Sequence, residues 1–355
     1  MQTLFTLGLM LLLLNGCSGG GTSAPDTENS ANTSSESTQT ETDTQTPRPI
    51  TPQEMVKRME TGVDATWSEV PNKIARYTTQ ATEAFARKGF RHIRLRVAEE
   101  NASKMWGYLD KEIQDALDNG MIPIIANQSA TFEEEPTPEH QAAWVTWWGE
   151  VAKHYKDAPY ELMFDLEIEI AAKSPLSQEP ITQLNEAYRE AIHAIRHAGG
   201  HNDKRIIIVS AHRRSDPKKL AMLDTDSYEG NDYLIGEFHE GYASGPSKDP
   251  NSLHYYKDGS TEREITLIEE RVRAAAAWRE QTGIPVWEGA WMPGNYNKGD
   301  DYTIEEQKQF ASDFVKILNK YRIPHAINAT KKYYDVETNR WNAREEVVDY
   351  ILSLR

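Results

Sequence analysis

The chain has 355 residues, of which 39 are Lys or Arg and 55 are Asp or Glu, and its formal net charge is -16. This acidity, together with the lack of a large basic cluster, excludes a general nucleic-acid-binding protein. A single cysteine excludes an intrachain disulfide, so the fold must be stabilised by its hydrophobic core. Nine Trp and sixteen Tyr residues could stack on sugars, although most Trp residues in a domain belong to its core.

Residues 1–16 have the pattern of a signal peptide. An apolar, Leu-rich run ends at Leu14-Asn15-Gly16, directly before Cys17, and it is too short to span a membrane. This arrangement resembles the lipobox of bacterial lipoproteins, in which the cysteine is lipidated and becomes the mature N-terminus. We therefore expect Cys17 to anchor the protein to a membrane of the cell envelope, at the outer membrane or cell surface. No Lys or Arg precedes the apolar run, so a plain secretory signal is the alternative.

Residues 17–52 are predicted to be a flexible tether. They are dominated by Ser, Thr, Gly, Asn, Gln and acidic residues, which cannot bury enough apolar surface to become ordered. Residues 53–355 then form a single domain, whose size suits one α/β barrel. No later stretch is long and apolar enough to cross a membrane. We expect a monomer.

The domain alternates short apolar runs with longer helical patterns, which predicts βαβ units and a parallel sheet. The predicted strands are 62–65, 92–97, 122–128, 160–170, 205–210, 233–239, 284–291 and 324–328. The predicted helices are 73–88, 104–119, 138–155, 183–198, 261–282, 303–321 and 343–354. The connection between the fifth and sixth strands is too polar for a clear helical pattern. Eight strands with intervening helices predict a (β/α)8 TIM barrel.

The predicted fourth strand carries three carboxylates, Asp165, Glu167 and Glu169, at alternate positions. Alternation places them on one face of the strand and the intervening apolar residues on the other. Directed into a barrel, they would form an acidic row that ends at its mouth. The alternative is an amphipathic strand with its acids in solvent.

Several segments match the motifs of one enzyme family. Residues 89–95, Gly-Phe-Arg-His-Ile-Arg-Leu, look like its second-strand Val-Arg-Ile-Pro motif, with Arg94 on the arginine. Residues 164–170, Phe-Asp-Leu-Glu-Ile-Glu-Ile, align with Phe-Glu-Leu-x-Asn-Glu-Pro, and His239 and Tyr242 look like a sixth-strand His-x-Tyr with one extra residue. From about residue 62 onward, the chain thus resembles glycoside hydrolase family 5, the cellulase-like barrel glycosidases. The resemblance implies a polysaccharide hydrolase with Glu169 as general acid/base.

The chain departs from this family pattern around the expected site. Ile168 and Ile170 replace the Asn before and the Pro after the acid/base residue, and Gln128 stands where the third strand usually carries His. The family's nucleophile Glu on the seventh strand corresponds to Ala290, and its eighth-strand Trp corresponds to Asn328 or Ala329. The second catalytic carboxylate must therefore come from another position.

Glu288 is the first candidate for that second carboxylate. It lies two residues before Ala290, so strand alternation places it on the same face, deeper in the barrel and within reach of an inverting pair with Glu169. A deeper pair of Glu167 and Glu288 is a further option. The structural interpretation is that Glu167, Glu237 and Glu288 neutralise Arg94 and Arg96 inside the barrel.

Two other functions remain open. A lyase acting on a uronate polymer needs groups that neutralise a carboxylate, and a base that takes the adjacent proton. The candidates to neutralise are Arg94, Arg96, Asn127, Gln128 and Arg213, and the candidate bases are His239 and Tyr242. A catalytically inactive, glycan-binding barrel would use the aromatic and polar loop 291–297 at the barrel mouth.

Among these functions, the family resemblance favours hydrolysis of a polysaccharide. The predicted catalytic residues are Glu169, Glu288, His239 and Tyr242, and the predicted substrate-binding residues are Asp64, Arg94, Gln128, Trp291, Asn295 and Asn328. Trp291 has the alternative of a packed core ring. No ligand-spacing motif supports a metal site, so we expect neither a metal nor another cofactor.

Overall fold

The computed structural model describes residues 48–240, 245–252, 254–256, 261–299 and 302–355. The predicted signal peptide, Cys17, the tether up to residue 47, and Tyr242 lie outside these residues. Within them, every helix is too short or too polar to cross a membrane.

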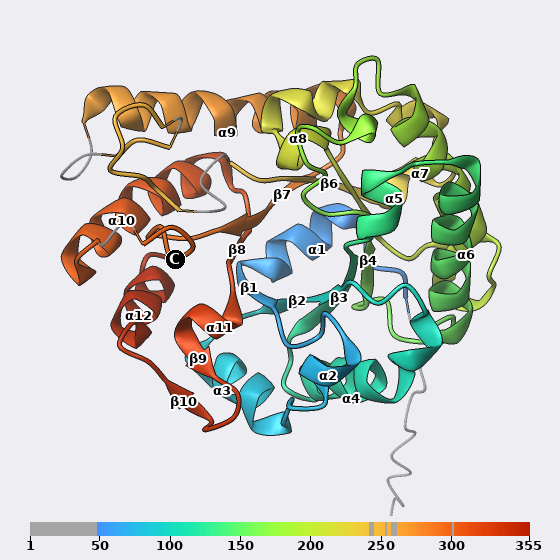
Figure 1. Ribbon diagram of the computed structural model, residues 1–355, viewed down its shortest axis with the longest axis horizontal. Helices are drawn as coiled ribbons and strands as arrows, with labels where there is room; N and C mark the ends of the chain where they lie inside the picture. The colour runs from blue at the N-terminus through green and yellow to red at the C-terminus, as the bar shows by residue number, and fades with distance from the viewer. Residues whose placement is uncertain (1–47, 241–244, 253, 257–260, 300–301) are drawn as a thin grey trace, which may run out of the picture. The chain divides into compact units, whose positions relative to one another are not determined.

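Eight parallel strands close into a barrel, which confirms the predicted (β/α)8 fold (Figure 1). They are β1 (Thr61–Ala65), β2 (His92–Val97), β3 (Ile122–Asn127), β4 (Met163–Asp165), β5 (Ile207–Ser210), β6 (Leu234–Phe238), β7 (Val286–Trp291) and β8 (His325–Ile327). Strands β1 and β8 close the barrel, with Thr61 opposite His325.

Helices surround the barrel (Figure 1). The longer ones are α3 (Thr79–Lys88), α4 (Trp106–Asp118), α6 (Pro138–His154), α7 (Thr182–Arg196), α9 (Glu262–Thr282), α10 (Ile304–Tyr321) and α12 (Glu345–Ser353). Short helices α2 (Pro71–Ile74), α5 (Ala130–Glu134), α8 (His212–Ser215) and α11 (Thr330–Tyr333) follow strand ends, and β9 (Tyr334–Asp335) pairs with β10 (Arg340–Trp341). Between β5 and β6 the chain forms only α8 and short 3-10 segments, in keeping with the polar sequence there.

The first helix, α1 (Pro52–Met59), was not predicted from the sequence. It begins with a capping box in which Thr51 and Glu54 satisfy each other's backbone N–H groups. Ile50, Met55 and Met59 are buried and pack with residues of the barrel interior such as Trp287. The folded domain therefore begins by Ile50, three residues before the predicted start at residue 53.

Strand β4 is much shorter than the predicted strand 160–170 and ends at Asp165. Beyond it, Leu166 N–H still donates to Ile208 O at 3.1 Å, and Ile168 N–H to Asn127 O at 3.2 Å. Glu169 then adopts a left-handed φ of 58°. The side chains from Asp165 to Glu169 therefore do not alternate as in a regular strand. The prediction that Asp165, Glu167 and Glu169 share one face depended on that alternation.

Candidate active site

A pocket of about 790 Å³ lies where strands end. It is lined by Gln128 after β3, Glu169 after β4, His239 after β6 and Asn328 after β8. The carboxyl ends of the strands are where barrel enzymes place their catalytic residues. The structure thus brings together four of the predicted site residues.

Glu169 is the carboxylate that contacts the pocket histidine. Its Oε1 lies 3.5 Å from His239 Nδ1, and its side chain is 26% exposed. Burial alone would raise the pKa of Glu169, but its ion pair with His239, together with the charges of Arg96 and Arg94, outweighs burial and lowers it. Glu169 is therefore ionised at neutral pH.

His239 is held between two carboxylates. Its Nε2 lies 2.8 Å from Glu237 Oε1, on the side of the ring opposite Glu169. Burial lowers the pKa of His239, but Glu237 and Glu169 raise it to about 10. The ring is therefore a cation at neutral pH, and it forms an ion pair with Glu169 through Nδ1.

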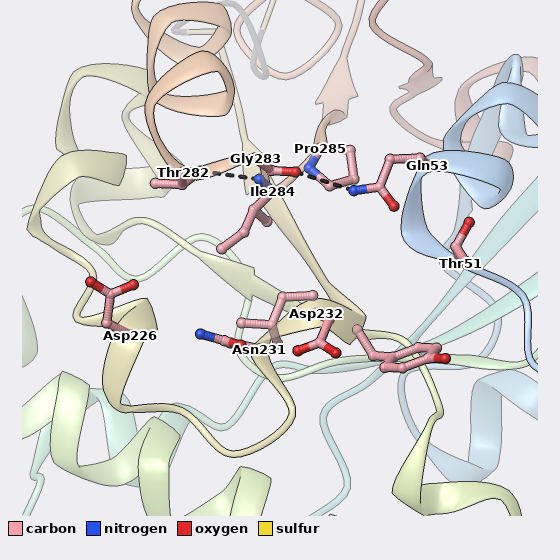
Figure 2. Close-up of a pocket in the computed structure, with 11 residues that line it drawn as sticks. Thr51, Gln53, Asp226, Asn231, Asp232, Thr282, Gly283, Ile284 and Pro285 are labelled. Carbon is pink, nitrogen blue, oxygen red and sulfur yellow. Dashed lines mark hydrogen bonds between the residues drawn. The ribbon is translucent and has the colours of Figure 1, made fainter.

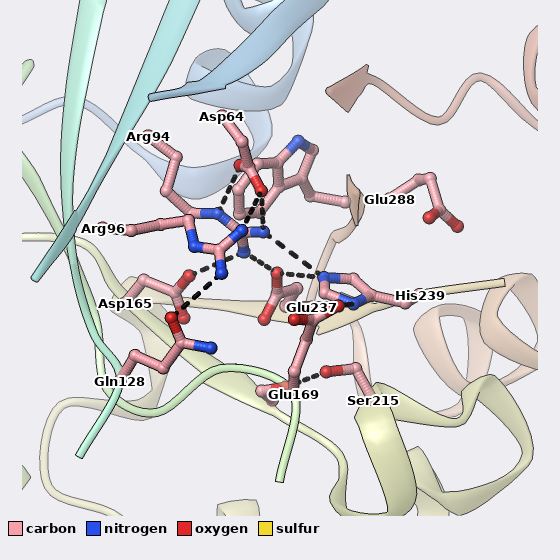
Figure 3. A network of polar contacts seen from close by, with 12 residues as sticks. Asp64, Arg94, Arg96, Gln128, Asp165, Glu169, Ser215, Glu237, His239 and Glu288 are labelled. Atoms are coloured by element: carbon pink, nitrogen blue, oxygen red, sulfur yellow. Dashed lines mark hydrogen bonds and ion pairs between the residues drawn. The ribbon is translucent and has the colours of Figure 1, made fainter. Parts of the chain in front are cut away.

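A buried ion network lies next to His239 (Figure 3). Arg94 donates to both oxygens of Asp64, at 2.7 and 2.9 Å, to Asp165 at 3.1 Å, and to Glu237. All four side chains are fully buried. Arg94 and Asp64 do not line the pocket, so their predicted role in substrate binding would have to be indirect. Glu237 connects this network to the site because it contacts both Arg94 and His239.

Glu167 does not pair with Arg94 or Arg96, contrary to the expected ion pair. Its Oε1 accepts the backbone N–H of Ser129 at 3.1 Å, and burial raises its pKa well above the usual range. Arg96 instead donates to Gln128 Oε1 at 3.0 Å. The expectation fails because the chain leaves regular strand geometry after Asp165.

Glu288 is buried and does not line the pocket. Its Oε2 accepts the backbone N–H of Glu240 at 2.9 Å, and burial raises its pKa well above the usual range. A Cβ at the next residue, Gly289, would collide with the side chain of Glu237, so Gly289 faces the barrel interior there. Figure 3 shows Glu288 apart from the Arg94 network. Glu288 therefore lies outside the pocket lining, and its pairing with Glu169 stays a prediction.

Trp291 and Asn295, two predicted substrate-binding residues, are buried away from the pocket lining. The Trp291 indole donates to His325 Nδ1 at 3.0 Å, and its ring packs on Phe314 with a centroid separation of 4.9 Å. Trp291 is thus a core ring, as its alternative interpretation allowed.

Sequence reasoning missed Glu133, which lies on α5 and lines the pocket. Its Oε1 accepts the Ala171 N–H at 2.6 Å. Burial, and then the charges of Glu134 and Glu169, raise its pKa. The signal available in the sequence was its place just after the third strand, where barrel loops reach the active-site face.

The structure also places a strained turn at the pocket. Arg213, Arg214 and Ser215 have left-handed φ angles of 58°, 61° and 55°. Non-glycine residues in this conformation cost about 1–3 kcal/mol each. Backbone bonds hold the turn, from Arg214 N–H to Ile170 O at 2.6 Å and from His239 N–H to Ser215 O at 2.7 Å. The turn is thus tied to the segments that carry Glu169 and His239.

A second cavity, of about 420 Å³, lies at the other end of β6 and β7 (Figure 2). Its lining includes Leu234 and Pro285, at the start of these strands, and Gln53, which donates to Gly283 O at 3.2 Å. The amino-terminal face of a barrel contributes to stability rather than to chemistry. We therefore place the active site in the larger pocket.

The described residues contain one group able to hold a metal ion, formed by His193, His197 and Glu229. All three are exposed, and none of them lines the pocket. The pocket itself is lined by carboxylates, histidines and cations.

Comparison with known proteins decides the family. Residues 51–333 match the family described as cellulase, glycosyl hydrolase family 5. The chain belongs to this family. As a member of the cellulase family, this protein is a glycosidase of the endoglucanase-like type, as predicted. No curated protein sequence matches the chain.

Solved structures of family 5 share the fold at low sequence identity. Endoglucanase Cel5A from Thermotoga maritima is 19% identical with a TM-score of 0.71, over 85% of this chain and 100% of that one. ZgEngAGH5_4 in complex with a cellotriose is 20% identical with a TM-score of 0.71, over 86% and 99%. A broad-specificity endoglucanase from Clostridium acetobutylicum is 18% identical with a TM-score of 0.70, over 85% and 99%.

Proposed function

We propose that this family 5 enzyme hydrolyses a polysaccharide in the pocket, with Glu169 as its acid/base residue, at the surface of the cell. The observation that carries the proposal is the ionised Glu169 carboxylate, which contacts protonated His239 at the carboxyl end of β4. The cellobiose and cellotriose complexes of similar structures support a polysaccharide as the substrate. The lipobox-like sequence ending in Cys17 supports the location.

Glycoside hydrolysis requires a second carboxyl group, and Glu133 is the best candidate in the pocket. Environments push the pKa values of Glu169 and Glu133 in opposite directions, downward for Glu169 and upward for Glu133. Two nearby carboxyl groups with such opposed shifts are suited to acid and base roles. Glu133 then donates a proton to the departing glycosidic oxygen, while Glu169 takes one from the attacking water.

The mutation Glu169→Gln tests the acid/base role. It keeps the size of the side chain and removes the charge that accepts a proton, so turnover should fall by about 10²–10⁴-fold with the fold intact. The assay measures reducing ends released from a panel of polysaccharides. Full activity of this variant would overturn the proposal.

The mutation Glu133→Gln separates the two roles. It should also reduce cleavage of the polysaccharide, but an aryl glycoside of the released sugar with a good leaving group needs little acid assistance and should be cleaved almost normally. Glu169→Gln should remain slow on both substrates. Equal losses on both substrates for Glu133→Gln would show that Glu133 is not the acid.

One observation favours a second candidate, a lyase acting on a uronate polymer. Cations line the pocket, and the family's nucleophile position is Ala290. In elimination, ionised Glu169 would remove a proton next to a carboxylate that the cations neutralise. Unsaturated products that absorb near the ultraviolet edge would identify the lyase, and reducing ends alone the hydrolase. Binding without any turnover would indicate an inactive glycan-binding barrel.

A further inference from the structure

Four cations in the pocket lining have no ion-pair partner among the residues that the structure describes. Arg213, Arg214, Lys218 and Lys331 all line the pocket and are exposed. None of their side chains forms an ion pair or hydrogen bond with the part of the chain that the structure describes, unlike Arg271, which pairs with Asp216. Carboxylates also line this pocket, and most of them have partners of their own: Glu69 pairs with Lys73, Glu169 with His239, and Asp216 and Glu240 with Arg271.

The four cations come from two separate sides of the barrel. Arg213 and Arg214 belong to α8, directly after β5, and Lys218 follows in the next turn. Lys331 belongs to α11, directly after β8. Strands β5 and β8 are not neighbours in the closed barrel, and Figure 1 shows α8 and α11 on different sides of it. A polymer crossing the pocket would therefore meet cations on both sides.

The strained turn presents two of these cations. Arg213 and Arg214 are adjacent, like-charged and left-handed, and backbone bonds to Ile170 and from His239 hold their segment. These bonds involve main-chain atoms, so they explain the turn but not the presence of two arginines. Strained backbone of this kind is concentrated at functional sites.

We propose that the substrate is an anionic polysaccharide, and that Arg213 and Arg214 bind the carboxylate or sulfate groups of its sugar units. This inference rests on the proposed function and adds the substrate class to it. Arginine binds carboxylate and sulfate oxygens through paired, charge-assisted hydrogen bonds. A neutral glucan would cover the four cations without giving them partners, so the same residues select against neutral polymers.

The experiment measures binding in the Glu169→Gln background, so that turnover does not disturb it. The charged probes are polygalacturonate, alginate and a sulfated carrageenan. Their neutral counterparts are methyl-esterified polygalacturonate, cellulose and desulfated carrageenan. We expect binding to charged polymers only, and a decrease in affinity as salt rises from about 50 to 300 mM. Comparing polygalacturonate and alginate with carrageenan shows whether the pocket binds carboxylate or sulfate groups.

The double mutation Arg213→Asn with Arg214→Asn removes both charges, and Asn is the side chain other than Gly that best tolerates left-handed φ. It should weaken binding of the charged polymer by at least about 10-fold. The control is Lys153→Gln with Lys316→Gln, which removes two exposed, unpaired cations of α6 and α10 outside the pocket. The affinity of this control variant for the charged polymer should stay within about twofold of the affinity before the two Lys changes. Thermal unfolding of both variants verifies folding.

Three results would overturn the inference. They are preferential binding of neutral polymers, no binding to any charged polymer at low salt, and equal losses in the pocket and control variants. The proposed function is tested separately. Glu169-dependent cleavage of a neutral polymer would leave that function intact while rejecting the anionic substrate.

Discussion

His239 Nδ1 lies 3.5 Å from Glu169 Oε1, at the boundary between the pocket and the barrel interior. The other nitrogen of the ring contacts Glu237, which also binds Arg94. One imidazolium thus links the Glu169 carboxylate to the buried ion network. The charge state of Glu169 consequently depends on residues that the substrate does not touch.

Replacing His239 by Asn should shift the acid limb of the pH–activity profile to higher pH. His239 lowers the pKa of Glu169 against the effect of burial, so its loss should raise that pKa towards or above the usual 4.5. Activity is lost when the base becomes protonated, so the loss should begin at higher pH in the variant. The pH dependence of kcat/KM measures this in the free enzyme.

His254→Asn is the matched control, because His254 also lines the pocket and its pKa is lowered to about 4, mainly by burial. The His254 ring is neutral over most of the pH range of the assay, so its replacement should leave the acid limb of the pH–activity profile unchanged. An unchanged acid limb in His239→Asn would show that His239 does not set the charge of Glu169.

Replacing Arg94 by Met should destabilise the fold strongly. The change leaves Asp64, Asp165 and Glu237 buried without their common cation, and breaking a buried ion pair on one side costs about 3–5 kcal/mol. Denaturant-induced unfolding measures the loss. Arg96→Met is the comparison, since its side chain is 12% exposed, its hydrogen-bond partner is the neutral Gln128, and its ion pair with Asp64 is longer, at 3.7 Å. Similar losses in both variants would contradict a special role for Arg94.

Replacing Glu112 by Gln should remove a pH-dependent loss of stability. Glu112 is buried, and burial raises its pKa to about 8 from the usual 4.5. Between these values the folded protein keeps a proton that the unfolded chain has released. The free energy of unfolding therefore falls as pH rises through this window, by up to about 1.4 kcal/mol per pH unit.

Unfolding of wild type and Glu112→Gln at pH values from 5 to 9 checks this, with about 1.4 kcal/mol per unit as the largest slope difference. Asp118→Asn, on the exposed side of the same helix, should keep the wild-type slope. A wild-type slope in Glu112→Gln would show that Glu112 is ionised in the folded protein.

Replacing Cys17 by Ser should release the protein from the membrane fraction. The prediction rests on the position of Cys17 after Leu14-Asn15-Gly16. A single lipid-bearing residue would provide the anchor, so its loss leaves no covalent attachment. Fractionation followed by immunoblotting measures the distribution, with Ser18→Ala as the control. Continued membrane association of Cys17→Ser would contradict lipidation at this residue.

The barrel could be predicted from sequence because its signals are local. Each strand is a short apolar run, all but the fifth are followed by a helical pattern, and the eight strands close into a barrel. Glu169, His239, Gln128 and Asn328 could be named because each comes at the end of a predicted strand. The structure places all four at one pocket.

The tertiary structure alone decided which charged groups meet. The chain leaves regular strand geometry after Asp165, so alternation gave the wrong partner for Glu167. The register between β7 and β8 is irregular from Glu288 to Trp291, and Glu288 lies outside the pocket lining. Glu133 on α5 and Lys331 on α11 come to the pocket from parts of the chain distant in sequence, and their chemistry depends on that proximity. Periodicity encodes which face a regular element buries, whereas the pKa and the partner of a side chain depend on neighbours that only the folded chain supplies.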